Sequence, residues 1–173
     1  MTYPPESRQR HEPGVPSPLF SKPERLFNLQ LTARLEASGF RVFLPQRDGV
    51  DRKTAPYDAI GSEDRRRAMF RLDRQKVLDC DVFLFLLDGR VPDEGACVEL
   101  GIAHCERYLR GGGKLFGGLH TDTRAAFIGS RLNPMVRVAL DYITEDEQAL
   151  LRLLSGYGTW RRNAEAERGG GNP

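Results

Sequence analysis

Four carboxylates lie close together in one segment of the chain, Asp88 to Ala103 (DGRVPDEGACVELGIA). Asp88, Asp93 and Glu94 follow an apolar run, and Glu99 comes next among apolar neighbours. A carboxylate in an apolar environment is costly unless it is hydrogen-bonded or useful. Glycosyl chemistry uses such groups: one ionised carboxylate attacks or stabilises an oxocarbenium-like carbon, and another handles the leaving group's proton. The segment therefore indicates glycosyl chemistry.

A purely structural interpretation of the same segment is also open. In it, Asp93 and Glu94 are solvated loop and helix-capping residues, and Glu99 lies on the exposed face of a helix. Asp73 has the same two interpretations. It lies beside Leu72 near the inward stripe of an expected helix, or it is an exposed aspartate balanced by neighbouring arginines. The residue pattern by itself does not separate the alternatives.

The elements that hold these carboxylates follow from capping signals and hydrophobic patterning. Ser21-Lys22-Pro23-Glu24 has the residue types of a capping box and predicts a helix start, and Gly39 is a typical helix end. The run Val82–Leu87 is apolar on both faces, as in a central parallel strand covered by helices. The other predicted elements are strands at 40–44, at 114–118 and within 136–142, and helices at 63–78, 96–109 and 145–154.

Strands that alternate with helices predict an α/β fold. We expect a flavodoxin-like or Rossmann-like three-layer arrangement with a parallel sheet of about five strands. In such sheets, ligands bind at the carboxyl ends of the strands. The loops after Leu44, Leu87 and Gly118 should therefore face the site.

Composition limits the classes of protein. The 173 residues contain 39% hydrophobic and 29% charged residues with a net charge of +2, which argues against wholesale disorder and against nucleic-acid binding driven by bulk charge. No apolar run is long enough for a membrane helix, and the N-terminus lacks the apolar region of a secretory signal. Cys80, Cys97 and Cys105 lie in apolar stretches, which is typical of reduced thiols in a cytoplasmic protein.

The composition also predicts the domain boundaries. Residues 1–16 are rich in proline and lack periodicity, so we expect a flexible extension. Residues 17–160 form the single domain, and the polar, glycine-rich residues 161–173 are expected to be a disordered tail.

Several segments, taken together, resemble the nucleoside 2-deoxyribosyltransferase family. The resemblance extends from Pro18 to Met135, and Asp73 precedes Asp81 by eight positions as Asp93 precedes Glu99 by six. The segments that carry it are Pro18-Leu19-Phe20-Ser21, Phe43-Leu44-Pro45-Gln46, the Asp73 helix, Cys80-Asp81-Val82, Asp88-Gly89, Pro92-Asp93-Glu94-Gly95, Glu99-Leu100-Gly101, Thr121-Asp122-Thr123-Arg124 and Asn133-Pro134-Met135.

The resemblance implies a catalytic role for three carboxylates. Glu99 matches the family's nucleophile, which attacks the anomeric carbon of a 2′-deoxynucleoside and holds a covalent deoxyribosyl ester. Asp73 and Asp93 match carboxylates that contact the base and manage its proton. A second base then attacks the ester, so 2-deoxyribose passes between bases with retained β configuration, a reaction of nucleoside salvage.

The resemblance also implies a substrate-binding set and an assembly. Phe20 is expected to pack on the base, Gln46 to contact its edge, and Asn133 to reach a neighbouring subunit's site and bind the sugar 5′-hydroxyl. Asp88, Gly95 and Met135 lie in the matching segments and complete the expected set. The partners are then nucleosides, free nucleobases and further copies of the chain, as a dimer or hexamer. No metal, organic cofactor, nucleic acid or membrane is expected.

One segment departs from the family pattern. Family members usually open with a β-branched strand that ends in glycine before Pro-Leu-Phe-Ser, whereas this chain has Pro13-Gly14-Val15-Pro16-Ser17. Prolines are poor residues for a central strand. We therefore expect a first strand that is short, irregular or missing, with Ser17 close to the base pocket.

Two other functions stay open. An N-glycoside hydrolase of nucleosides or nucleoside 5′-monophosphates would use the same carboxylates, although Asn133 suits a free 5′-hydroxyl better than a phosphate. A non-catalytic nucleoside-sensing module is supported only by the irregular first strand. Gly111-Gly112-Gly113-Lys114 looks like a phosphate-binding loop, but its spacing is wrong, and a turn into a strand is the better interpretation.

Overall fold

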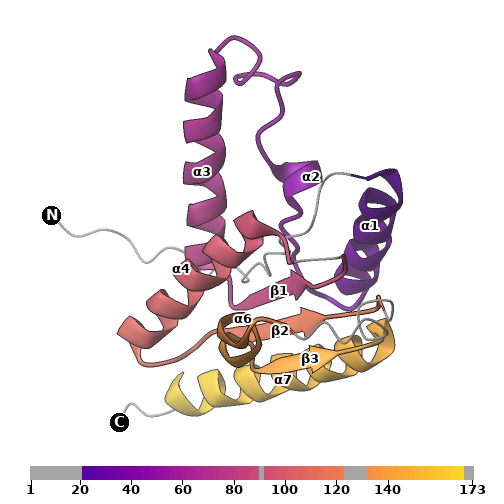
Figure 1. Cartoon of the computed structure of the whole chain (residues 1–173). Coiled ribbons are helices and arrows are strands. Elements are labelled where there is room, and N and C mark those ends of the chain that lie inside the picture. Colours follow the sequence, from indigo (N-terminus) through magenta and orange to yellow (C-terminus); the bar gives the residue numbers. More distant parts are fainter. Residues whose placement is uncertain (1–20, 90–91, 123–131, 170–173) are drawn as a thin grey trace, which may run out of the picture.

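The computed structural model of the chain describes residues 21–89, 92–122 and 132–169. The expected N-terminal extension, the segment that departs from the family pattern and Phe20 lie outside the described residues. The described elements, in chain order, are helices α1 (Lys22–Ala37), α2 (Pro45–Asp48) and α3 (Ser62–Asp79), strand β1 (Val82–Leu86), helix α4 (Glu94–Arg110), strand β2 (Leu115–Leu119), helix α6 (Pro134–Ala139), strand β3 (Tyr142–Thr144) and helix α7 (Glu147–Gly169) (Figure 1).

The three described strands form a parallel sheet in the order β1-β2-β3. Val82 of β1 pairs with Leu115 of β2, and Gly117 of β2 pairs with Tyr142 of β3. Because parallel neighbours end at the same edge of a sheet, the loops that follow β1 and β2 lie side by side. This edge is where the sequence predicts the site.

Alternate residues of β1 divide the core into two layers. Val82, Leu84 and Leu86 pack in one apolar cluster with α1 and α7. Phe83 and Phe85 pack in a second cluster with residues of α3, α4 and α6. The sheet therefore has helices on both faces, and the predicted three-layer α/β fold is confirmed. The count of about five strands stays a prediction.

Helix α1 begins and ends as the sequence predicts. The Ser21 hydroxyl accepts a hydrogen bond from the Glu24 N–H at 3.3 Å, and the Glu24 carboxylate accepts one from the Ser21 N–H at 2.9 Å. This reciprocal pair is a capping box. At the other end, Gly39 has a φ of 89°, a left-handed conformation that side chains disfavour.

Two predicted strands differ from the structure. In residues 40–44 only Phe43 makes a bridge, and Pro45 then begins α2. The strand predicted within 136–142 is wrong in most of its length, because α6 occupies 134–139 and β3 begins only at Tyr142. Asn133 caps α6 and Pro134 occupies its first turn, so a helix start outweighs the β-branched valines that favour a strand.

The last helix is longer than predicted. Helix α7 continues to Gly169, through most of the segment that the sequence assigns to a tail. The residues after Trp160 include alanine, glutamate and arginine, which have high helix propensity. Among the described residues, no helix has the length and apolar character that crossing a membrane requires.

Candidate active site

Glu99 lies in the second turn of α4, half-buried between two buried neighbours of the same helix, Ala96 and Leu100. Burial, together with the negative charges of Asp73 and Asp93, raises the pKa of its carboxyl group from 4.5 to about 7. Both causes penalise the ionised form. Glu99 is therefore a carboxyl group that exchanges its proton near neutral pH.

Asp73 approaches Glu99 from a different helix. It lies in α3, which packs against α4, and its side chain is half-buried. Burial raises the pKa of Asp73 from 3.8 to about 6. The negative charge of Asp73 in turn acts on Glu99 across the contact between α3 and α4. The interpretation of Asp73 as an exposed aspartate is therefore wrong, because its side chain is half-buried.

Asp93 completes the carboxylate group from the N-terminus of α4. One of its oxygens, Oδ1, accepts a hydrogen bond from the Ala96 N–H at 2.8 Å, so Asp93 is the N-cap of the helix. A side chain at Gly95 would place its Cβ 3.1 Å from this Oδ1, which is a tight contact. Gly95 therefore leaves room for the cap. Asp93 therefore both caps α4 and lies close enough to Glu99 to act on it, although the sequence analysis treated these roles as alternatives.

Asp88 follows β1 and is held by the loop after β2. The Thr121 N–H donates to Oδ1 at 2.5 Å, the Thr121 hydroxyl to Oδ2 at 2.6 Å, and the Asp122 N–H to Oδ1 at 2.8 Å. Three donors on one carboxylate make a strong link between the two loops. Asp88 thus joins the loops at the carboxyl edge of the sheet.

Gln46 and Asn28 connect α2 to α1. The Gln46 side chain donates to the Arg25 carbonyl at 2.8 Å and accepts from Asn28 Nδ2 at 3.2 Å. Asn28 is 1% exposed. With Asp88 and four other residues it lines a hollow of about 200 Å³ at the end of β1, the others being Pro23, Glu24, Phe27 and Leu86.

The sequence analysis did not identify Asn28, nor the two hydrogen bonds that Thr121 donates to Asp88. A signal for Asn28 was present, because it lies one turn before Leu31 and Thr32 on the buried stripe of α1. A polar residue on such a stripe requires a partner, here Gln46. The hydrogen bonds from Thr121 to Asp88 could not be predicted from the neighbouring sequence, since they depend on the pairing of β1 with β2.

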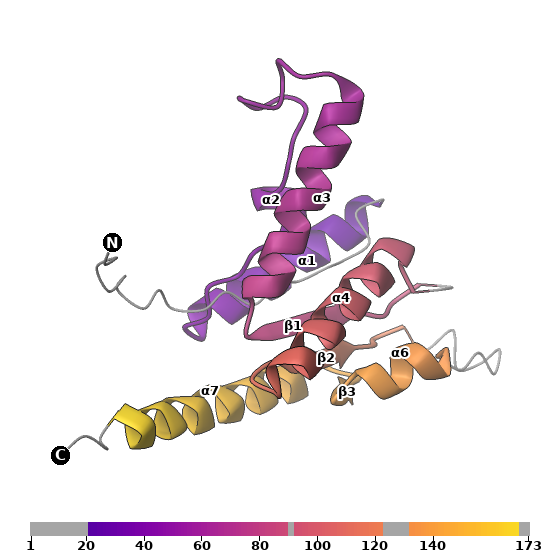
Figure 2. The ribbon, with the colours of Figure 1, turned by 90° about the vertical axis from the view of Figure 1, so that its left-hand side faces the viewer.

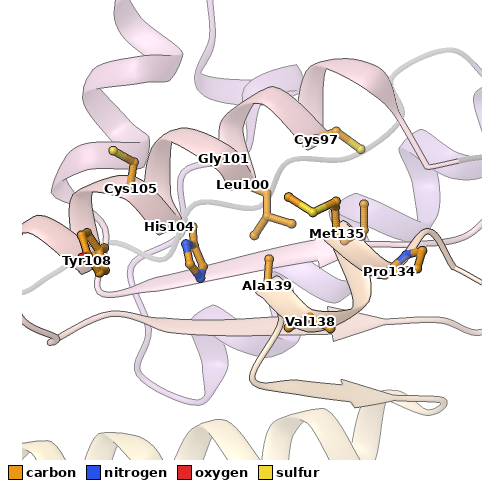
Figure 3. Close-up of a pocket in the computed structure, with 11 residues that line it drawn as sticks. Cys97, Leu100, Gly101, His104, Cys105, Tyr108, Pro134, Met135, Val138 and Ala139 are labelled. Atoms are coloured by element: carbon orange, nitrogen blue, oxygen red, sulfur yellow. The ribbon is translucent and has the colours of Figure 1, made fainter.

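Asn133 and Met135 lie apart from the carboxylates, at the start of α6. The Asn133 side chain accepts from the Met135 N–H at 2.8 Å, and Met135 is 82% exposed. Met135 borders an apolar hollow of about 750 Å³ between α4 and α6. Figure 3 shows Leu100 of α4 and Ala139 of α6 pointing toward one another across it. Glu99 does not line this hollow, although it neighbours Leu100 in sequence.

The described residues offer no metal site: no three or more His, Cys, Asp and Glu side chains in this part of the chain are grouped so as to hold an ion. The chemistry available at this site is that of carboxyl groups. The site combines a pair, Glu99 and Asp73, with a third carboxylate, Asp93, that caps α4.

Comparison with known proteins places this site in a family. The model of the nucleoside 2-deoxyribosyltransferase family matches residues 15–154. The chain belongs to this family. The match covers the described carboxylates and most of the domain, so the family resemblance predicted from the sequence is confirmed. Membership in the nucleoside 2-deoxyribosyltransferase family indicates a glycosyltransferase-type enzyme.

Solved structures agree with this fold. A conserved protein from Enterococcus faecalis V583 is 21% identical, with 83% of this chain and 96% of that chain covered and a TM-score of 0.64. A 2-deoxyribosyltransferase from Bacillus psychrosaccharolyticus is 20% identical, with 81% and 90% covered and a TM-score of 0.63. A 2-desoxiribosyltransferase from Leishmania mexicana is 16% identical, with 84% and 97% covered and a TM-score of 0.54. No curated protein matches the chain in sequence.

Proposed function

We propose that this protein transfers 2-deoxyribose between nucleobases through a covalent deoxyribosyl ester on Glu99. The observation that carries the proposal is that Asp73 of α3 meets Glu99 and Asp93 of α4 where the two helices pack. The reaction needs one carboxylate that attacks while another carboxyl group carries a proton. Glu99, Asp73 and Asp93 are three neighbouring carboxyl groups among which these two roles can be divided.

The proposed reaction has two steps. Ionised Glu99 attacks C1′ of the deoxynucleoside, the N-glycosidic bond breaks, and its electron pair leaves with the base. The departing base takes one proton from one of the two aspartates, Asp73 or Asp93. An incoming base then attacks C1′, the ester bond breaks, and the proton of the new base returns to the same aspartate. Two inversions at C1′ give overall retention.

The proposed substrate pocket is the hollow bounded by Asn28 and Asp88. Gln46 acts there through Asn28, which it orients by its hydrogen bond, and Asp88 holds the loop that begins at Thr121. Phe20 stays a proposed stacking residue for the base. Gly95 leaves room for the Asp93 carboxylate where it caps α4.

We also propose that the enzyme is a homo-oligomer in which Asn133 completes a neighbouring subunit's site. Asn133 begins a helix whose Met135 and Val138 are 82% and 80% exposed. Large apolar side chains in a cluster on a surface are typical of protein contacts. Their position beside the α4–α6 hollow supports an interface that includes Asn133 and Met135.

Base exchange tests the proposal. The protein is incubated with thymidine or deoxyinosine, with and without adenine, and the products are separated by chromatography. Deoxyadenosine that forms only with adenine present, and only when Glu99 is intact, is the expected result. Glu99→Ala is the inactive control.

The same assay distinguishes the hydrolase. Free deoxyribose without deoxyadenosine would contradict the transferase and would direct the assay to nucleoside 5′-monophosphates. Binding of nucleosides without turnover of either substrate class would contradict both enzymes and would leave the sensing module.

A further inference from the structure

Lys114 is a buried lysine that the proposed reaction does not use. It follows the three-glycine turn that the sequence presents as a false phosphate-binding loop, and it is 8% exposed at the start of β2. Burying a lysine is costly unless its ammonium group is fully hydrogen-bonded. The partners of Lys114 therefore explain why it lies inside the protein.

The Lys114 ammonium group binds the C-terminal end of α3. Its Nζ donates to the carbonyl oxygens of Val77 at 2.8 Å, of Leu78 at 3.2 Å and of Cys80. The last carbonyl groups of a helix lack partners within the helix and carry its partial negative charge. Lys114 is a cation placed where those oxygens converge.

The surrounding charged groups come from α4 and from the segment before β3. Glu106 Oε2 lies 3.6 Å from Nζ, and its other oxygen pairs with the exposed Arg110 at 2.7 Å. The Cys80 thiol lies 3.5 Å from Nζ. Arg107 donates a hydrogen bond to the Lys114 carbonyl oxygen at 3.2 Å and forms an ion pair with Asp141. Lys114 thus links α3 to α4 as well as to β2.

Lys114 is one of a few contacts that hold helix α3, together with its packing on α4 and Lys76 over the Phe43 ring. All 18 residues of α3 lie in the described part of the chain, and Val77 is its one buried side chain. The N-terminal end of α3 stands away from the sheet in both views (Figures 1 and 2). Its C-terminal end, where Lys114 binds, is the end that meets the body of the protein.

Lys114 and the two carboxyl groups, Asp73 and Glu99, lie along the same contact between α3 and α4. Asp73 precedes Val77 by four residues, about one turn of α3. Glu99 precedes Glu106 by seven residues, about two turns of α4, so both project from one face. Lys114 therefore holds the same two helices together, further along their contact.

We propose that Lys114 is a positioning residue, which fixes α3 against α4 and thereby sets the approach of Asp73 to Glu99. This role rests on the proposed function only for its effect on catalysis. The approach itself is a property of the folded chain, which can be measured without substrate. Loss of Lys114 should let α3 move, let water reach Glu99, and lower the pKa of that carboxyl group.

Lys114→Met tests the proposal, since it keeps most of the length of the unbranched side chain and removes the charge and donors. The titration of Glu99 is followed by NMR in protein labelled with ¹³C at glutamate side-chain carboxyl groups. The Glu99 signal is the one missing from Glu99→Gln. We expect its midpoint to fall by about one pH unit or more in Lys114→Met, toward the value in Asp73→Asn.

Two controls separate positioning from general loss of stability. Arg110→Met removes a cation from Glu106 without touching α3. Leu154→Ala creates a cavity in the layer formed with α1, away from α3 and α4. Both should leave the Glu99 midpoint within about 0.3 pH unit of the unsubstituted protein, a shift that small environmental changes produce. If Lys114→Met does not fold, Lys114→Gln, which keeps one amide donor, is titrated instead and should shift in the same direction.

An unchanged Glu99 midpoint in a folded Lys114 variant would overturn the proposal. So would an equal shift in Leu154→Ala. Base exchange measured on the same proteins tests the proposed function separately: kcat should fall about tenfold or more in Lys114→Met with KM changed much less. A protein without exchange activity in which Lys114→Met still shifts Glu99 would contradict the proposed function and support the positioning role.

Discussion

Glu99 and Asp73 show how one site raises the pKa values of two carboxyl groups. Burial raises both pKa values, and the negative charges of Asp73 and Asp93 add to the shift of Glu99. The spacing of these residues was visible in the sequence, and so was their helical setting. The sequence did not show that Glu99 and Asp73 come close to one another, because that depends on how α3 crosses α4.

Asp73→Asn should lower the pKa of Glu99. The substitution removes one of the two negative charges that raise it, so the remaining causes are burial and Asp93. The acid limb of the pH profile of kcat/KM, where Glu99 ionises, should therefore move below pH 7. Activity should fall about 10²-fold or more because a proton carrier is lost. An acid limb that stays in place would show that Asp73 does not act on Glu99.

Glu99→Gln should stabilise the fold at pH 8. The folded-state pKa of Glu99, about 7, is above its ordinary value of 4.5. The ionised group therefore destabilises the folded state above pH 7, and this penalty disappears as pH falls below 4.5. We expect a gain of about 1–3 kcal/mol in the free energy of unfolding at pH 8. Urea unfolding at pH 8 and pH 4.5 measures it, and an equal gain at both values would contradict this origin.

At the scale of the elements, the sheet edge depends on a link between loops. Asp88 receives three hydrogen bonds from Thr121 and Asp122. The sequence predicted that the loops after β1 and β2 meet, because parallel strands end together. It did not predict that Asp88 would be occupied in joining them, since that requires the register of Val82 with Leu115.

Asp88→Ala should loosen this edge. Two backbone N–H groups, those of Thr121 and Asp122, would lose their acceptor. We expect the free energy of unfolding to fall by about 1–3 kcal/mol, with a larger effect on KM than on kcat. Steady-state kinetics with a deoxynucleoside measure the effects on KM and on kcat separately. Thr54→Ala, in the loop at 49–61, is the control. A loss confined to kcat would assign Asp88 to the chemical step.

The elements also show where a sequence pattern is ambiguous. The strand Val82–Leu86 was predictable because its apolar run is short and lies between polar loops. The strand predicted within 136–142 overlaps α6, because Val136 and Val138 are β-branched and favour a strand. The stronger signal was Asn133 followed by Pro134, which is typical of a helix start.

At the scale of the whole molecule, a shared site would make the enzyme depend on its assembly. The exposed Met135 and Val138 lie beside Asn133, the residue proposed to serve a neighbouring subunit. The sequence predicted this sharing only through the family resemblance, because no pattern within one chain identifies the residues of a partner's site.

Complementation between inactive subunits tests the shared site. Glu99→Ala and Asn133→Ala proteins are mixed, dissociated and reassembled. If each site takes Glu99 from one subunit and Asn133 from another, random pairing restores about a quarter of the sites. Base exchange by the mixture, compared with each parent alone, measures the recovery. No recovery in a mixture shown to form mixed oligomers would place both residues in the same subunit's site.

The covalent ester on Glu99 is the most direct test of the whole account. The protein is incubated with thymidine without an acceptor base, quenched in acid, and examined by intact-protein and peptide mass spectrometry. We predict that the chain gains the mass of one deoxyribosyl group, located on the peptide that contains Glu99, and that adenine discharges it as deoxyadenosine. Turnover of thymidine without any such adduct, or an adduct that persists in Glu99→Ala, would contradict the account.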